Sequence, residues 1–187
     1  MAIKRYGYIV WMLLCALAFT ACNDDDGVDY EKLLELYGDW KTENEEAFKK
    51  VENDSQYSEI ASIGNDGSVY VKVLKEGTGK EPIFYNDSVK VYYTLWTIDG
   101  KVQDKHEPPY EEPIIFGANE VVSGWTTTLQ NMHVGDRWEV WIPYQLGYGI
   151  SGKYDNITGT YSILPFTTLH FEIEVLSIFR NGKEITK

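Results

Sequence analysis

Residues 113–149 read PIIFGANEVVSGWTTTLQNMHVGDRWEVWIPYQLGYG, and this stretch decides the fold. It begins with an apolar run at 114–116 that has the length of a short strand. Ser123 then precedes a segment that predicts a short helix over 124–132, with Ser123 as its N-cap and Gly135 beyond its end. A short strand followed at once by a short helix favours a helix packed on a sheet.

Alternation of apolar and polar residues continues on both sides of this stretch. It predicts a strand at 137–142, with Trp138, Val140 and Ile142 on one face. Asp99-Gly100 is typical of a hairpin turn. The same alternation predicts further strands at 68–74, 88–96 and 168–178. Five or six antiparallel strands and one short helix make an α+β domain, with the sheet folded over the helix.

The segment 30–66 is predicted to be an N-terminal helical extension. Asp29 can cap a helix over 30–51, because apolar residues recur there near the helical period of 3.6. A short strand is expected near Ile60. The helix can pack on the main domain or recognise a partner, and packing is the expectation. Its apolar positions are Leu33, Tyr37, Trp40, Ala47, Phe48 and Val51.

The composition suits one domain with accessory segments. The chain has 187 residues, of which 43% are hydrophobic and 25% charged, and its formal net charge is −12. An acidic chain lacks the basic footprint of a nucleic-acid-binding protein, so we expect no nucleic-acid partner. We expect a monomer. The aromatic share of 14% favours β structure.

The first 21 residues resemble a secretory signal peptide. Two cationic residues precede an apolar run at 9–19, which is too short to span a membrane comfortably. The small residues before Cys22 resemble a bacterial lipobox, in which that cysteine becomes lipidated. An ordinary signal peptide with an incidental cysteine is the alternative. On the first interpretation, residues 22–29 are a lipid-anchored linker, and the protein is attached to the outer membrane of the cell envelope, on its periplasmic face or at the surface.

Aromatic and branched residues occur on separate short elements: Tyr93, residues 121–125, residues 147–149 and Phe171. If they converge, they form an apolar pocket that acts by shape, desolvation and a few hydrogen bonds. The three histidines are isolated from one another and from suitably spaced Cys, Asp or Glu. We therefore expect neither a metal site nor a cofactor.

The order of these elements over residues 67–178 resembles the FKBP-type peptidyl-prolyl cis-trans isomerases. The ordered set at matching spacing carries the identification. Its motifs are VLKEGTG at 73–79, VKVYYT at 89–94, DGKVQD at 99–104, PIIF at 113–116, VVSGW at 121–125, LQNM at 129–132 with Gly135, IP at 142–143, GYG at 147–149 and LPFTTLHFEI at 164–173.

The resemblance implies a half-open antiparallel β-sheet wrapped around the short α-helix. It places the isomerase domain at 67–179 and leaves 180–187 as a C-terminal tail. It also implies a pocket for proline-containing polypeptides. The catalytic positions are Tyr93, Asp104, Trp125, Tyr148 and Phe171, and the substrate-binding positions are Ile114, Phe116, Val121, Val122 and Ile163.

Three of these residues have distinct roles by resemblance. Trp125 corresponds to the indole that forms the floor of the pocket. Tyr148 corresponds to a phenol that donates a hydrogen bond to a substrate carbonyl, and the backbone N–H of Val122 corresponds to a second donor. Such a pocket suits X–Pro isomerisation, because the twisted amide has lost charge separation and is favoured by apolar surroundings.

Three departures from the family pattern stand out. Gln103 replaces the aromatic residue that usually precedes Asp104, which should remove an aromatic wall and weaken prolyl binding. Leu95 stands where glycine is usual. The loop from Tyr148 to Pro165 is longer than in compact members.

The sequence therefore predicts an isomerase acting on X–Pro bonds of exported or envelope proteins, with activity reduced by Gln103. Two alternatives remain at this point. A catalytically weak FKBP-like chaperone or protein-binding module is motivated by Gln103 and the long loop. A glycan-binding surface lipoprotein is suggested by the tyrosines of that loop.

Overall fold

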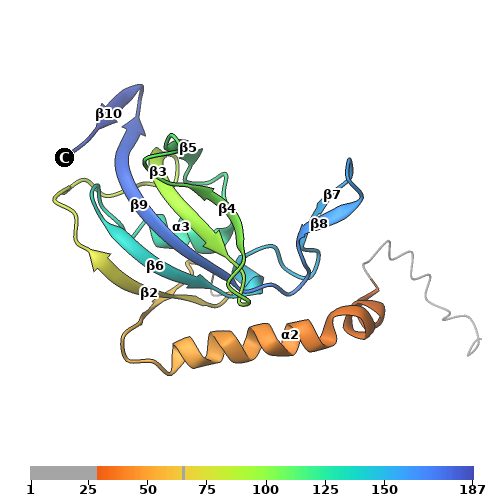
Figure 1. Cartoon of the computed structure of the whole chain (residues 1–187). Helices are drawn as coiled ribbons and strands as arrows, with labels where there is room; N and C mark the ends of the chain where they lie inside the picture. Colours follow the sequence, from red (N-terminus) through yellow and green to blue (C-terminus); the bar gives the residue numbers. More distant parts are fainter. Residues whose placement is uncertain (1–28, 65) are drawn as a thin grey trace, which may run out of the picture.

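The computed structural model describes residues 29–64 and 66–187 (Figure 1). The predicted signal peptide at 1–21 and lipidation at Cys22 lie outside these residues. No helix in the described part is long and apolar enough to cross a membrane. The elements are, in chain order, α2 (Tyr30–Glu52), β1 (Ser58–Ala61), β2 (Ser68–Lys75), β3 (Ser88–Trp96), β4 (Val102–His106), β5 (Ile114–Gly117), α3 (Ser123–Leu129), β6 (Arg137–Ile142), the 3-10 turn η2 (Tyr144–Leu146), β7 (Lys153–Asp155), β8 (Thr160–Ile163), β9 (Leu169–Arg180) and β10 (Lys183–Ile185).

The main sheet is antiparallel, with the strand order β1-β2-β6-β9-β3-β4. Strand β5 pairs with β3, and β10 pairs with β9. The long strand β9 lies between β6 and β3, and its residues alternate between buried and half-buried along most of its length. This alternation puts an apolar row on one face of the sheet, as expected for a sheet that covers a core on one side. The predicted α+β class is confirmed.

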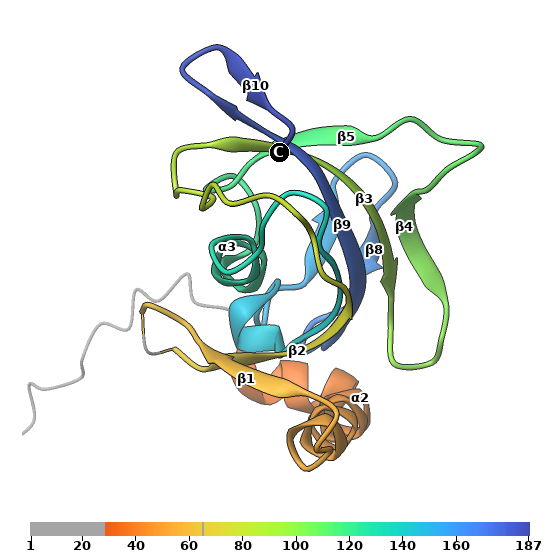
Figure 2. The same ribbon diagram turned by 90° about the vertical axis from the view of Figure 1, so that its left-hand side faces the viewer.

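The sheet curves around α3, which lies inside the curve (Figure 2). Leu129 of this helix is fully buried, as are Val140 and Ile173 of the sheet. The helix approaches β6 so closely that a Cβ atom at Gly124 would lie 2.3 Å from the Ile142 side chain. Glycine is therefore required at 124, and it brings the neighbouring Trp125 against the concave face of the sheet.

The start of α3 differs from the prediction. The N-cap is Val122, which makes no side-chain capping bond, and Ser123 is the first helical residue. The Ser123 hydroxyl instead donates to the Leu146 carbonyl at 3.2 Å, which ties the helix start to η2. The helix ends at Leu129, three residues before the predicted 132, because the chain continues there in tighter turns between residues three apart.

Helix α2 packs against the end of the sheet that carries β1 and β2 (Figures 1 and 2). Its N-cap is Asp29, as predicted, with the side chain accepting from the Lys32 N–H at 3.1 Å. Asn44 is fully buried, and its Oδ1 accepts from the Thr168 N–H at 2.8 Å. Trp40 donates from Nε1 to the Thr167 hydroxyl at 3.0 Å. The helix is thus joined to the segment that leads into β9.

Two segments without predicted structure form hairpins. Within the long loop, β7 pairs with β8 as a separate two-stranded ribbon. Within residues 180–187, predicted as a tail, β10 folds back on β9. The turn between them uses Asn181 and Gly182, both with positive φ. Asn-Gly favours that turn geometry.

Candidate functional site

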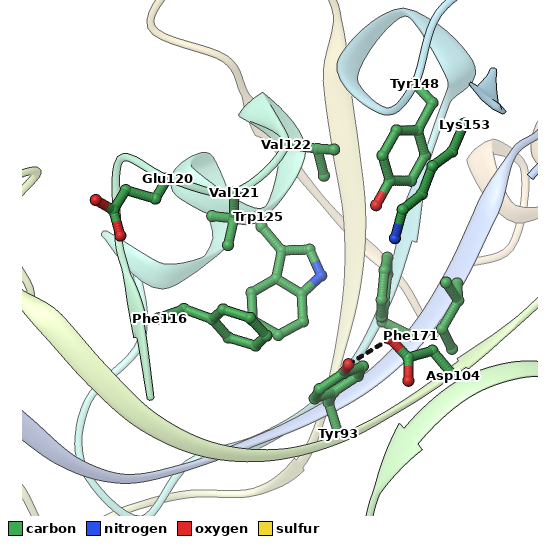
Figure 3. Close-up of a pocket in the computed structure, with 11 residues that line it drawn as sticks. Tyr93, Asp104, Phe116, Glu120, Val121, Val122, Trp125, Tyr148, Lys153 and Phe171 are labelled. Carbon is green, nitrogen blue, oxygen red and sulfur yellow. Dashed lines mark hydrogen bonds between the residues drawn. The ribbon is translucent and has the colours of Figure 1, made fainter. Parts of the chain in front are cut away.

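A cavity of about 380 Å³ opens between the concave face of the sheet and the start of α3 (Figure 3). Strands β3, β4, β5 and β9, the segment between β5 and α3, the helix α3 itself and the chain after η2 all contribute to its wall. Its lining residues are Tyr93, Leu95, Asp104, Phe116, Glu120, Val121, Val122, Trp125, Tyr148, Lys153 and Phe171.

Trp125 forms the floor of this cavity. Only 3% of the residue is exposed, and three aromatic rings surround it with their planes nearly perpendicular to the indole plane. The ring centroids of Tyr93, Phe116 and Phe171 lie 5.5, 5.7 and 5.3 Å from that of the indole. These are favourable edge-to-face geometries, so the three rings hold the indole in a fixed orientation.

The indole Nε1 of Trp125 is buried and has no hydrogen-bond partner among the described residues. In Figure 3 this atom faces the open centre of the cavity. An unpaired buried donor is costly. The Trp138 Nε1 is likewise buried and unpaired among the described residues, so what distinguishes Trp125 is its place in the cavity lining.

The Tyr93 hydroxyl donates to Asp104 Oδ2 at 2.6 Å, across the β3–β4 pair. Burial, and then the Asp104 carboxylate, raise the pKa of Tyr93, so the phenol stays protonated through the neutral range. The bond fixes the Asp104 side chain against the wall and keeps the Tyr93 ring edge-on to Trp125. This pair therefore shapes the cavity and is not placed for proton transfer.

Tyr148 lies at the rim, with its hydroxyl directed into the cavity (Figure 3). A compact turn holds it: the Gly149 N–H donates to the Tyr144 carbonyl at 2.8 Å, and the Gly152 N–H to the Tyr148 carbonyl at 3.1 Å. No hydrogen bond to the Tyr148 hydroxyl or to the Val122 N–H is found within residues 29–64 and 66–187. Both donors remain available to a bound chain.

Eight of the ten predicted pocket residues lie in the cavity lining. The two that do not are Ile114 and Ile163. Ile163 is 4% exposed and belongs to the hydrophobic core, and Ile114 is half-buried and packs against that core. Both belong to the packing of the core.

Gln103 is also absent from the lining, so the position at which a wall residue was expected contributes no wall to this cavity. The pairing of β3 with β4 shifts register between Leu95 and Trp96: Leu95 lies opposite Asp104, but Trp96 lies opposite Val102, which leaves Gln103 without a partner in the register. The Gln103 amide there donates to the Thr97 hydroxyl at 3.2 Å and is exposed. The wall at this corner is instead contributed by Leu95, which is 4% exposed.

Three lining residues were not predicted as site residues: Leu95, Glu120 and Lys153. Leu95 had a visible signal, because it replaces a usual glycine. Glu120 directly precedes the quoted motif at 121–125. No sequence signal points to Lys153, because it reaches the cavity through the β7–β8 hairpin, and the sequence pattern predicts a loop there.

Comparison with known proteins agrees with this geometry. Residues 79–176 match the family described as FKBP-type peptidyl-prolyl cis-trans isomerase. The FKBP-type 22 kDa peptidyl-prolyl cis-trans isomerase of Escherichia coli is 37% identical over 133 residues, which cover 71% of this chain and 60% of that protein. The outer membrane protein MIP of Legionella longbeachae is 38% identical over 107 residues, which cover 57% of this chain and 42% of that protein.

A solved structure shares the fold. The peptidyl-prolyl cis-trans isomerase of Pseudomonas syringae pv. tomato superposes with a TM-score of 0.59 and 30% sequence identity, over 82% of this chain and 98% of that one. The match to the two curated relatives spans only 60% and 42% of their lengths. The similarity therefore concerns a part of each relative.

Proposed function

The chain belongs to the FKBP-type peptidyl-prolyl cis-trans isomerase family, and we propose that it catalyses cis–trans isomerisation of X–Pro bonds. The observation that carries this proposal is the buried Trp125 floor, enclosed by three aromatic rings, with an unpaired N–H facing the cavity. A prolyl ring is a compact apolar group that fits such a floor.

The mechanism is preferential binding of the twisted amide. Rotation about a peptide bond has a barrier of roughly 18–20 kcal/mol because resonance must be broken, and an X–Pro bond isomerises over tens of seconds or more. The twisted amide has less charge separation than the planar one. A dry aromatic cavity therefore binds the transition state more tightly than the ground state, which is what lowers the barrier.

The rim donors hold the chain while the bond rotates. The Tyr148 hydroxyl and the Val122 N–H are available to donate hydrogen bonds to carbonyl groups on either side of the prolyl residue. The Tyr93–Asp104 bond keeps the opposite wall in place. No proton transfer or covalent intermediate is needed, so positioning and desolvation account for the rate.

A catalytic assay tests the proposal. Protein comprising residues 23–187, which contains all described residues, should accelerate isomerisation of short X–Pro peptides and the refolding of a protein limited by proline isomerisation. No acceleration in either assay, combined with suppression of aggregation, favours the chaperone alternative. Glycan binding that is lost in Tyr154→Ala and Tyr161→Ala favours the glycan-binding alternative.

We propose further that Cys22 is lipidated, so that the enzyme acts on exported or envelope proteins from a membrane anchor. The support is the sequence of the first 22 residues. Labelling of growing cells with a radioactive fatty acid should mark the full chain. The variant Cys22→Ser should lose the label and leave the membrane fraction. Labelling that persists in this variant contradicts the anchor.

A further inference from the structure

Two charged side chains line the prolyl cavity on opposite sides, and only the Lys153 ammonium points toward its centre, since the Glu120 carboxylate is turned away (Figure 3). Glu120 lies at the side formed by the chain before α3, and Lys153 lies at the side formed by the β7–β8 hairpin (Figure 3). The Lys153 ammonium lies beside Tyr148, with Nζ 5.8 Å from the centroid of that ring. Its charge is thus placed next to one of the groups that hold the substrate chain.

Backbone geometry fixes the position of Lys153. The residue starts β7 and is in register with the buried Ile163 of β8. Ser162 donates from its hydroxyl to the Lys153 carbonyl at 3.1 Å. The preceding Gly152 has φ +63°, and a Cβ atom there would lie 2.5 Å from the Ile163 carbonyl oxygen. Only glycine allows this turn, so the chain is built to deliver Lys153 to the rim.

The Lys153 charge has no carboxylate partner among residues 29–64 and 66–187, where all ion pairs within 4.0 Å involve other cations. Asp104 is also in the lining, where its Oδ2 accepts the Tyr93 hydroxyl, and no ion pair within 4.0 Å joins it to Lys153. Glu120 lies on the other side of the cavity (Figure 3). Lys153 is therefore available to pair with a charge on the substrate.

We infer that Lys153 makes the site selective for X–Pro bonds with an acidic side chain adjacent to the proline. This inference rests on the proposed isomerase function. With the prolyl ring on Trp125 and the chain held near Tyr148, a neighbouring Glu or Asp reaches the ammonium, whereas a neighbouring Lys is repelled by it. The formal net charge of −12 means that the protein as a whole repels acidic peptides. A preference for acidic peptides must therefore come from a local positive charge.

The test compares peptides that differ only beside the proline. Two series carry Glu, Gln or Lys directly before or directly after it. Isomerisation is followed by NMR exchange spectroscopy, which needs no coupling protease. At low salt, kcat/KM for the Glu peptide of one series should exceed that for its Gln counterpart by about two- to fivefold, the range of an exposed ion pair.

Charge variants identify the source of the preference. Lys153→Met should remove it and Lys153→Glu should reverse it in favour of Lys peptides. Lys183→Met is the matched control, since it removes the same charge from the distant strand β10 and should leave the preference unchanged. A Glu preference that persists in Lys153→Met, or none in the wild type, overturns the inference.

A binding measurement separates this inference from the proposed function. Affinities of the same peptides are measured by quenching of tryptophan fluorescence. Catalysis without discrimination between Glu and Lys peptides in rate or affinity overturns the selectivity alone. Tighter binding of the Glu peptide that depends on Lys153, without any catalysis, overturns the isomerase proposal and upholds the selectivity. Neither catalysis nor discrimination overturns both.

Discussion

Trp125 illustrates how far single residues could be placed from the sequence. Its position after Gly124, in the ordered set of motifs, led to the expectation of a pocket floor, and the structure puts it at the base of the cavity. Gln103 shows where placement from the sequence fails. Its place in the sequence is that of a wall residue, but a shift in strand register near Leu95 turns it outward. Alternation along a strand cannot reveal such a shift.

A prediction at this scale concerns the Tyr148 hydroxyl. Tyr148→Phe should lower kcat/KM by about three- to tenfold, the effect of one lost hydrogen bond to the substrate. Stability should be unchanged, because the hydroxyl has no hydrogen-bond partner within the described residues. Steady-state kinetics and thermal unfolding measure the two effects. Tyr144→Phe, outside the cavity lining, is the control; equal losses in both variants contradict the role of Tyr148.

At the scale of elements, regular alternation was a reliable guide. The predicted strands at 88–96 and 137–142 match β3 and β6. The hairpins β7–β8 and β9–β10 were not predicted, because their paired segments are too short to show a clear alternation. Asn181-Gly182 was nonetheless a usable turn signal. The docking surface of α2 depends on the buried polar residue Asn44, which a hydrophobic pattern cannot identify.

Docking of α2 predicts a measurable loss of stability. Asn44→Ala should lower the free energy of unfolding by about 1–3 kcal/mol, because it leaves the buried Thr168 N–H without its acceptor. Chemical denaturation measures this change. Lys50→Ala, on an exposed position of the same helix, should change stability by less than about 0.5 kcal/mol. An Asn44→Ala effect as small as that of the control contradicts the proposed docking contact.

The β7–β8 hairpin gives a second prediction for an element. Gly152→Ala should displace the hairpin and abolish the preference for acidic peptides, since its Cβ would lie 2.5 Å from the Ile163 carbonyl oxygen. Gly159 also has positive φ, at +71°, but its nearest neighbour lies 3.8 Å from the added atom. Gly159→Ala therefore controls for backbone strain alone. Peptide selectivity that survives in Gly152→Ala contradicts the role of this turn.

For the whole molecule, the α+β class and the sheet around a helix followed from pattern and resemblance together. The family assignment then rests on the matched region at 79–176 and on the shared fold. Packing of the N-terminal helix on the main domain was expected, but its place at the end of the sheet could not be derived, because it depends on contacts between residues more than 100 positions apart in the chain.

The pH dependence of overall stability gives a prediction that is independent of catalysis. Burial, and then a hydrogen bond to Glu139, raise the pKa of Tyr57 to about 12, from an ordinary value of 10.0. The folded state therefore retains a proton that the unfolded state loses, so this contribution is present below pH 10 and is lost as the pH rises toward 12.

Unfolding free energies between pH 9 and 11.5 test this linkage, with the window set by the two pKa values of Tyr57. Stability of the wild type should fall more steeply with rising pH than that of Tyr57→Phe, which has no phenol to titrate. Parallel slopes in the two proteins contradict the shifted pKa.

The most direct test of the central claim is the rate of X–Pro exchange in a short peptide, measured by NMR with catalytic amounts of residues 23–187. We predict exchange that is much faster than the uncatalysed process, which takes tens of seconds. Trp125→Leu should lower kcat/KM by about tenfold or more, which corresponds to ~1.4 kcal/mol of transition-state binding. Thermal unfolding confirms that this variant is folded. Exchange at the uncatalysed rate with wild-type protein, or equal catalysis by folded Trp125→Leu, contradicts the account.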